Sequence, residues 1–226
     1  MPSIKDNFEL VMENIERSIA VSGGKDKVSL VAVTKTVSYD RITEAVKAGV
    51  KIIGENRVAE AGEKFKLVNE NVTWHMIGHL QRNKIKHALQ IFDMIQSIDK
   101  IETALEIEKR AVKPIDILIE INSSGEETKS GVKPDQLFTL VDKLKTLKKV
   151  KIKGVMTIGP FTADEKRIRE AFAVTRQRFE ELAGMEKDPE IKYLSMGMSL
   201  DYRIAIEEGS NMVRVGSAIF GRRSST

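Results

Sequence analysis

The sequence lacks cysteine altogether, and it lacks any long uninterrupted apolar run. The first absence excludes disulfides, thiolate nucleophiles and cysteine-based metal sites, and it fits a reducing compartment. The second leaves no candidate for a membrane span, which needs about 18 consecutive apolar residues. The N-terminal stretch MPSIKDNFELVMENIERSIA carries acids throughout and has no apolar core, so we expect no signal peptide. Together these absences predict a cytoplasmic protein that does not enter the membrane.

A strong excess of one charge is missing as well. The 226 residues carry 37 Lys and Arg against 33 Asp and Glu, a formal net charge of +4. The densest basic run, KLKTLKKVKIK at 143–153, has no arginine and no interleaved aromatics, which favours a solvated surface over nucleic-acid contact. The sequence has three histidines and no H-E-x-x-H motif. We therefore expect neither nucleic acid nor a metal ion as a ligand.

The chain does contain a regular alternation of strand-like and helix-like segments. An amphipathic helix is expected over 4–21, and eight apolar, β-branched runs after it predict strands with helical patterns between them. The expected strands are 28–35, 50–54, 72–78, 91–98, 115–122, 150–159, 191–197 and 211–216. The clearest expected helices are 39–48, 56–69, 99–112, 134–148, 164–184 and 200–208.

This alternation indicates an α/β protein with a parallel sheet, and eight repeats predict closure into a (β/α)8 TIM barrel. An open, doubly wound sheet is the alternative. No linker, proline-rich segment or low-complexity stretch divides the chain. We therefore expect a single domain over residues 1–226, with residues 1–24 forming a helix packed outside the barrel.

Polar residues and glycines follow the predicted strands at the ends where such a barrel carries its active site. Lys35 ends the first strand, VSLVAVTK, whose composition predicts burial on both faces. A charged amine at that place either bends outward into water or takes part in chemistry. The other strand ends carry Asn56, His79, Asn122, Met156, Thr157, Ser199 and Arg214. So many residues, most of them polar, at the same end of the barrel favour a binding or active site there.

The last two strands predict an anion site. Ser199 precedes the helical run LDYRIAIEEG, and as its N-cap residue the hydroxyl would face the free N–H groups of the first turn. Gly216 lets the backbone approach closely, so N–H groups near Gly216 and Ser217 can point at a phosphate beside Arg214. A lysine amine facing a phosphate cradle suits an aldehyde-bearing phosphate held as a Schiff base. A sugar phosphate, as in Schiff-base aldolases, and pyridoxal 5′-phosphate (PLP) both meet this description.

Six segments, in order along nearly the whole chain, carry a family resemblance: AVTK, GENRVAE, WHMIGHLQRNK, INSSGEETKSG, GVMTIGP and LSMGMSLDYRIAIEEGSNMVRVGSAIFG. The sequence resembles the pyridoxal phosphate homeostasis proteins, which are related to the N-terminal barrel domain of alanine racemase. The resemblance implies PLP as the cofactor. It also implies a role in vitamin B6 and amino-acid homeostasis, with no established enzymatic reaction.

Carried over position by position, the resemblance assigns Lys35 to the aldimine with PLP. It implies that Arg214 faces the pyridine nitrogen. It implies further cofactor-binding positions in the phosphate cradle, at Ser199, Gly216 and Ser217, and along the pocket wall, at Asn56, His79 and Met156.

Two functions stay open. An always-protonated guanidinium beside the ring nitrogen disfavours a pyridinium, so the ring is a weak electron sink and carbanion chemistry is poorly supported. The first hypothesis is therefore a monomeric PLP-binding protein that stores PLP or delivers it to apo PLP-dependent enzymes. The alternative is a racemase-like enzyme acting on amino acids. The second acid/base of alanine racemase comes from a C-terminal domain, which a sequence ending at Thr226 is expected to lack.

Overall fold

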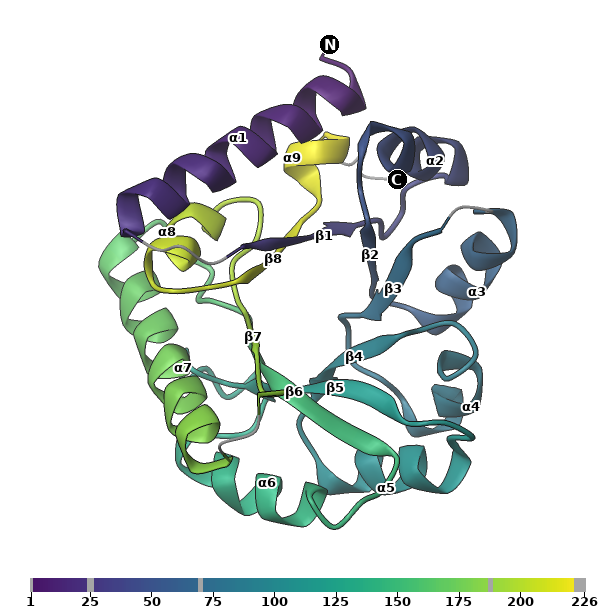
Figure 1. Ribbon diagram of the computed structural model, residues 1–226, viewed down its shortest axis with the longest axis vertical. Coiled ribbons are helices and arrows are strands. Elements are labelled where there is room, and N and C mark those ends of the chain that lie inside the picture. The colour runs from purple at the N-terminus through teal and green to yellow at the C-terminus, as the bar shows by residue number, and fades with distance from the viewer. Residues whose placement is uncertain (1, 24–26, 69–70, 187–188, 222–226) are drawn as a thin grey trace.

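The computed structural model describes residues 2–23, 27–68, 71–186 and 189–221. Within them, parallel strands close into a barrel in chain order, and the last strand pairs with the first (Figure 1). The (β/α)8 barrel and its eight predicted strands are confirmed, although the strand ends differ by a few residues. The strands are β1 (Ser29–Val33), β2 (Ile52–Glu55), β3 (Thr73–Met76), β4 (Met94–Ile98), β5 (Ile115–Ile121), β6 (Val150–Thr157), β7 (Tyr193–Ser195) and β8 (Met212–Val215).

Helices surround the barrel as an outer ring (Figure 1). The helix expected over 134–148 is shorter than predicted, because a 3₁₀ turn at Pro134–Gln136 precedes it, and the short helix after β8 was not predicted. The helices are α1 (Ile4–Ser22), α2 (Tyr39–Ala48), α3 (Val58–Leu67), α4 (Ile85–Ala88) after a 3₁₀ turn at Arg82–Lys84, α5 (Ile101–Arg110), α6 (Leu137–Leu144), α7 (Glu165–Glu186), α8 (Tyr202–Glu207) and α9 (Ser217–Phe220).

The N-terminal helix α1 lies outside the barrel, where it packs against α2, α8 and α9. Its first turn is closed by a capping box, in which Ser3 and Asp6 each accept the other's backbone N–H through a side-chain oxygen. Gly23 ends it in the left-handed conformation, at φ 67°. Ile4, Val11 and Ile15 are buried on its inner face, which fastens the helix to the ring.

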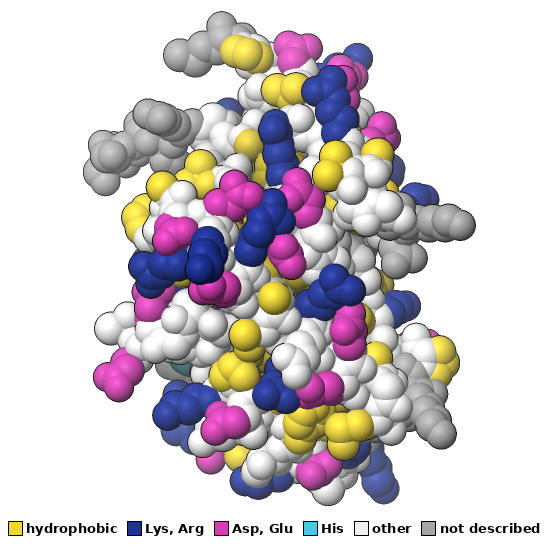
Figure 2. All heavy atoms as spheres, turned by 90° about the vertical axis from the view of Figure 1, so that its left-hand side faces the viewer, with side chains coloured by type: hydrophobic (Ala, Val, Ile, Leu, Met, Phe, Trp, Pro, Cys, Tyr) yellow, Lys and Arg dark blue, Asp and Glu magenta, His cyan; other side chains and the backbone are white. Residues whose placement is uncertain are grey.

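The outer surface over α1, α7 and α8 mixes charges of both signs, as Figure 2 shows. Some of these charged side chains form ion pairs. Arg169 on α7, for example, pairs with Glu165, Glu207 and Glu208. No helix among the described residues is long and apolar enough to cross a membrane.

Strand alternation divides the side chains of the barrel between two layers. Outward side chains such as Ala32 and Ile53 belong to the large core beneath the helices. Inward side chains fill the barrel with a smaller apolar cluster that includes Val31, Val33, Ile77, Met94, Leu118, Met156 and Met212. The same alternation puts Thr34 on the outward side of β1 and Lys35 on the inward side, at the mouth of the barrel.

Candidate functional site

Residues at the carboxyl ends of β2, β3, β5 and β6 line a cavity of about 210 Å³ at the mouth of the barrel. The predicted site residues of the other strand ends, Lys35, Ser199, Arg214, Gly216 and Ser217, do not line it. Asn56 and His79, both predicted site residues, lie on its wall, whereas Met156 is fully buried in the barrel interior. Ile158, two residues further along the chain, lines the cavity instead. The remaining lining residues are Ile77, Gly78, Glu120, Asn122, Lys129 and Ser130.

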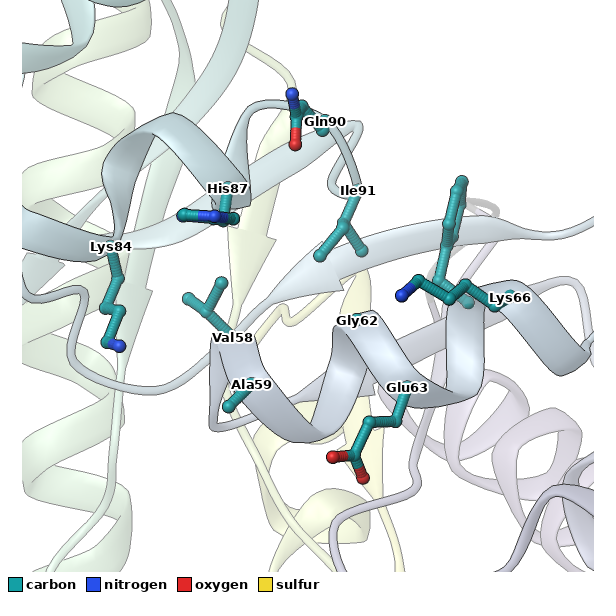
Figure 3. A pocket seen from close by; sticks show the side chains of 10 residues that line it. Val58, Ala59, Gly62, Glu63, Lys66, Lys84, His87, Gln90 and Ile91 are labelled. Carbon is teal, nitrogen blue, oxygen red and sulfur yellow. The ribbon is translucent and has the colours of Figure 1, made fainter.

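A larger cavity, of about 560 Å³, lies outside the barrel between α3 and the segment around α4 (Figure 3). Val58, Gly62 and Ile91 supply its apolar surface, while Lys66 and Lys84 add polar groups. It is a space between two members of the helical ring. The strand ends that carry the predicted site residues do not open into it, so the mouth of the barrel is the candidate site.

Lys35 and Gly216 follow neighbouring strands, β1 and β8, at the same end of the barrel. The register of β1 and β8 pairs Ala32 with Val215, which sets Gly216 beside Val33. A Cβ atom on Gly216 would come within 3.1 Å of the Val33 carbonyl oxygen, so the two backbones approach closely there. Lys35 follows two residues later and is half-buried.

Ser199 contacts the backbone that follows β8. Its Oγ accepts the N–H of Gly216 at 3.1 Å and that of Ala218 at 3.4 Å. The predicted capping role is wrong, because the chain turns once more before α8 begins, and Asp201 is the N-cap residue. Ser199 Oγ therefore binds backbone N–H groups in the segment where the sequence predicted an anion site. Ser217, which lies between Gly216 and Ala218, is exposed. A hydroxyl and converging backbone N–H groups form a typical anion cradle.

Arg214 is a buried cation on β8, with 3% of its surface exposed. Its Nη1 donates to the Ser195 carbonyl oxygen at 3.0 Å and to Ser195 Oγ at 2.7 Å. Its Nη2 donates to the Thr157 carbonyl oxygen at 2.7 Å. Burial lowers the pKa of Arg214 to about 10, which still leaves the guanidinium charged at neutral pH.

A buried polar network continues from Arg214 across the barrel. Ser195 Oγ donates to Gln96 Oε1 at 2.7 Å, and Gln96 Nε2 lies 2.8 Å from His75 Nδ1. Burial lowers the pKa of His75 to about 4, so the imidazole is neutral and its Nδ1 can accept from the Gln96 amide. Residues of β3, β4, β7 and β8 are thereby joined. The sequence did not reveal this network, because its members are single polar residues inside apolar strands.

Glu120 is another buried polar residue that the sequence did not reveal as part of the site. It lies on β5, lines the cavity and is 4% exposed. Burial, together with the charge of Asp99, raises its pKa to about 7 against the opposing effect of Arg214. Its position in IDILIEIN could have indicated that it belongs to the site. It lies two residues before Asn122 and therefore points to the same side of the strand. A carboxyl group that titrates near neutral pH thus lies in the mouth of the barrel.

Residues 7–224 match the model of the alanine racemase N-terminal domain family. A pyridoxal phosphate homeostasis protein of Aquifex aeolicus is 39% identical over 223 residues, which cover 96% of this chain and 97% of the relative. The chain belongs to the pyridoxal phosphate homeostasis protein family. Another member, from Vibrio cholerae, is 39% identical over 232 residues, which cover 99% of this chain and 98% of the relative.

The fold is also that of a solved structure with similar sequence. PipY of Synechococcus elongatus PCC7942, whose structure was solved with PLP bound, is 31% identical with a TM-score of 0.79. The match covers 92% of this chain and 100% of PipY. The family resemblance inferred from the six sequence segments is confirmed.

Proposed function

We propose that the protein binds PLP at the mouth of the barrel and serves PLP and amino-acid homeostasis without catalytic turnover. The observation that carries this proposal is that Lys35 follows β1 at the same end of the barrel as the backbone donors that follow the neighbouring strand β8. The names of the relatives and the PLP bound to PipY support the same ligand.

The groups at the mouth fit this cofactor chemically. When bound, PLP supplies an aldehyde that condenses with an amine, releasing water, and a pyridine ring whose electron demand depends on protonation of its nitrogen. Lys35 would provide the amine. Ser199 and the N–H groups of Gly216 and Ala218 would hold the phosphate, and Arg214 would face the ring nitrogen.

Arg214 gives the reason to expect binding without turnover. Its guanidinium is fixed by the Ser195 and Thr157 acceptors and stays charged, so it does not release a proton to the ring. A ring kept neutral withdraws electrons weakly, which disfavours carbanion chemistry. Storage of PLP, and its transfer to apo PLP-dependent enzymes, need no such chemistry, and a monomer with a complete site would suffice for both.

One observation favours the alternative of a racemase-like enzyme. Glu120 lies in the cavity with a pKa raised to about 7, which suits a group that exchanges protons at neutral pH. Deuterium exchange at the α-carbon of a panel of amino acids in heavy water separates the two functions. Robust exchange that is lost in Lys35→Ala and in Glu120→Gln would establish the enzyme and overturn the proposal of binding without turnover.

The proposed site is tested by borohydride reduction of the protein incubated with PLP, followed by peptide mass spectrometry. The pyridoxyl group is expected on the peptide that contains Lys35, and Lys35→Ala is expected to bind PLP reversibly through the phosphate alone. A pyridoxyl group found reproducibly on another lysine, with Lys35 unmodified, would refute the assignment.

A further inference from the structure

The turn that carries Lys35 has an unfavourable backbone conformation. Thr36 adopts φ 63°. All other described residues with a positive φ are glycines. A β-branched residue is poorly suited to that region, because its side chain crowds the backbone. Such a conformation persists only where the surroundings impose it.

Two side chains of α3 bind the backbone on either side of Lys35. Glu60 Oε1 accepts the N–H of Thr36 at 2.5 Å, and Lys64 Nζ donates to the carbonyl oxygen of Thr34 at 2.6 Å. Glu60 and Lys64 also pair with each other at 2.6 Å, as residues four positions apart on one helix face do. We call these two residues the α3 clamp.

The α3 clamp is anchored to β2 by Glu55, which is fully buried. Glu55 Oε1 accepts from Lys64 Nζ at 2.7 Å and from Thr34 Oγ1 at 2.6 Å. Its Oε2 is buried and has no hydrogen-bond partner within the described part of the chain. Burial accordingly raises the pKa of Glu55 despite the bonds from Lys64 and Thr34.

An incompletely satisfied buried ion pair contributes little to stability, because desolvation of its charges offsets their attraction. Stability alone therefore does not account for this arrangement. The cluster does have one geometric property: among the described residues, the side-chain hydrogen bonds that Glu55, Glu60 and Lys64 make outside it go to Thr34 and Thr36, the residues on either side of Lys35. Glu55 and Glu60 are also the two acidic residues of the GENRVAE segment. The proposed cofactor contacts give a role to only one residue of that segment, Asn56.

We propose that Glu60 and Lys64 are positioning residues that fix the turn at Thr36 and so present the Lys35 amine to the mouth of the barrel. This inference rests on the proposed function, because it takes Lys35 as the reacting amine. Since Thr34 and Glu55 point outward from the barrel, the clamp acts from behind the strand without touching the ligand.

The test compares the rate at which Lys35 becomes attached to added PLP, followed by absorbance, in four proteins beside the wild type. Glu60→Ala removes the acceptor of the Thr36 N–H, and Lys64→Met removes the donor to Thr34. Glu60→Gln keeps an oxygen acceptor and serves as the conservative control. Arg169→Met is the stability control, because it breaks three ion pairs away from the mouth, one within α7 to Glu165 and two from α7 to Glu207 and Glu208.

We expect Glu60→Ala and Lys64→Met to slow attachment about tenfold or more, as the loss of a hydrogen bond to a charged group predicts. Glu60→Gln should stay within about threefold of the wild type, since it loses only the charge. Arg169→Met should lower the melting temperature and leave the rate unchanged. Amide hydrogen exchange at Thr36 in the ligand-free protein should accelerate in Glu60→Ala only.

Rescue by glycine provides a second test of the same idea. Glycine reaches positive φ without steric cost, so adding Thr36→Gly to Glu60→Ala should restore most of the attachment rate. Attachment within about twofold of the wild type in both Glu60→Ala and Lys64→Met, with the wild type modified at Lys35, would overturn the positioning role and leave the proposed function intact. A wild-type protein that is never modified at Lys35 would refute both, whereas unchanged Thr36 exchange in Glu60→Ala would refute the clamp by itself.

Discussion

Replacing Glu120 by glutamine is expected to stabilise the protein, and the gain should depend on pH in a defined direction. Glutamine has nearly the same shape and carries no charge. The folded state raises the pKa of Glu120 from 4.5 to about 7, mainly through burial. Between these two values the folded protein binds a proton that the unfolded chain releases, so the wild type loses stability as the pH rises.

The size of the effect follows from that interval. Each pH unit is worth about 1.4 kcal/mol, so the interval from 4.5 to about 7 corresponds to about 3 kcal/mol. Below pH 4.5 the carboxyl is neutral in both states, and the variant should gain nothing from the missing charge. Near pH 8 the full difference should be present. For a protein of this size it amounts to a rise in melting temperature of about 6–12 °C.

The assay is chemical or thermal unfolding of the ligand-free wild type and Glu120→Gln at several pH values from 4 to 8. Glu126→Gln is the matched control, because its carboxylate pairs with Lys129, which lowers the pKa of Glu126. That control should be less stable than the wild type above pH 4.5, by an amount that does not change with pH there and that shrinks as the pH falls below 4.5. A stability difference for Glu120→Gln that is independent of pH, or that favours the wild type near pH 8, would mean that Glu120 is ionised and well paired in the folded protein.

Further predictions concern the phosphate cradle and the buried network. Ser199→Ala combined with Gly216→Val should weaken PLP binding about tenfold or more and pyridoxal binding much less, and equal losses in a competition titration would contradict the phosphate contact. Gln96→Leu should lower the free energy of unfolding by about 2–4 kcal/mol, because it removes the partner of the buried His75 Nδ1 and the acceptor of the buried Ser195 hydroxyl; a loss below about 1 kcal/mol would contradict this account. His75 should titrate by NMR near pH 4, and the wild type should lose stability as the pH falls from 6.5 towards that value. Titration near 6.5 would contradict its burial as a neutral imidazole.

The barrel itself could be predicted from the sequence because its signals are local and repeated. Each strand is a short apolar, β-branched run, and each recurs after a helical pattern, so eight weak signals reinforce one another. The site residues at strand ends could be predicted for the same reason. Lys35 and Asn56 follow their strands directly, and the fold rule that places active sites at the carboxyl ends then brings them together.

What escaped prediction depends on contacts between strands that are distant in the chain. Gln96 and Ser195 are 99 positions apart, and nothing local in MIQSI or YLSMG indicates that their side chains meet inside the barrel. Glu120 could be placed on an inward face by alternation, but its pKa near 7 depends on the burial that the closed barrel imposes. Ser199 was misread for a related reason, since its partners lie after β8 rather than in the next helix.

The alternation of side chains at each strand end explains how one mouth can be both polar and rigid. An inward residue such as Lys35 faces the mouth of the barrel, whereas its outward neighbour Thr34 faces the helical ring, where Lys64 of α3 donates to its carbonyl oxygen. Thr157 repeats the arrangement on β6, because its carbonyl oxygen accepts from Arg214 while its hydroxyl donates to the Ile121 carbonyl oxygen of the preceding strand, β5. Groups that face the mouth are thus held through the backbone and through neighbours that point away from it. Substitutions on the outward side should therefore alter the rate and geometry of ligand attachment without removing a single ligand contact.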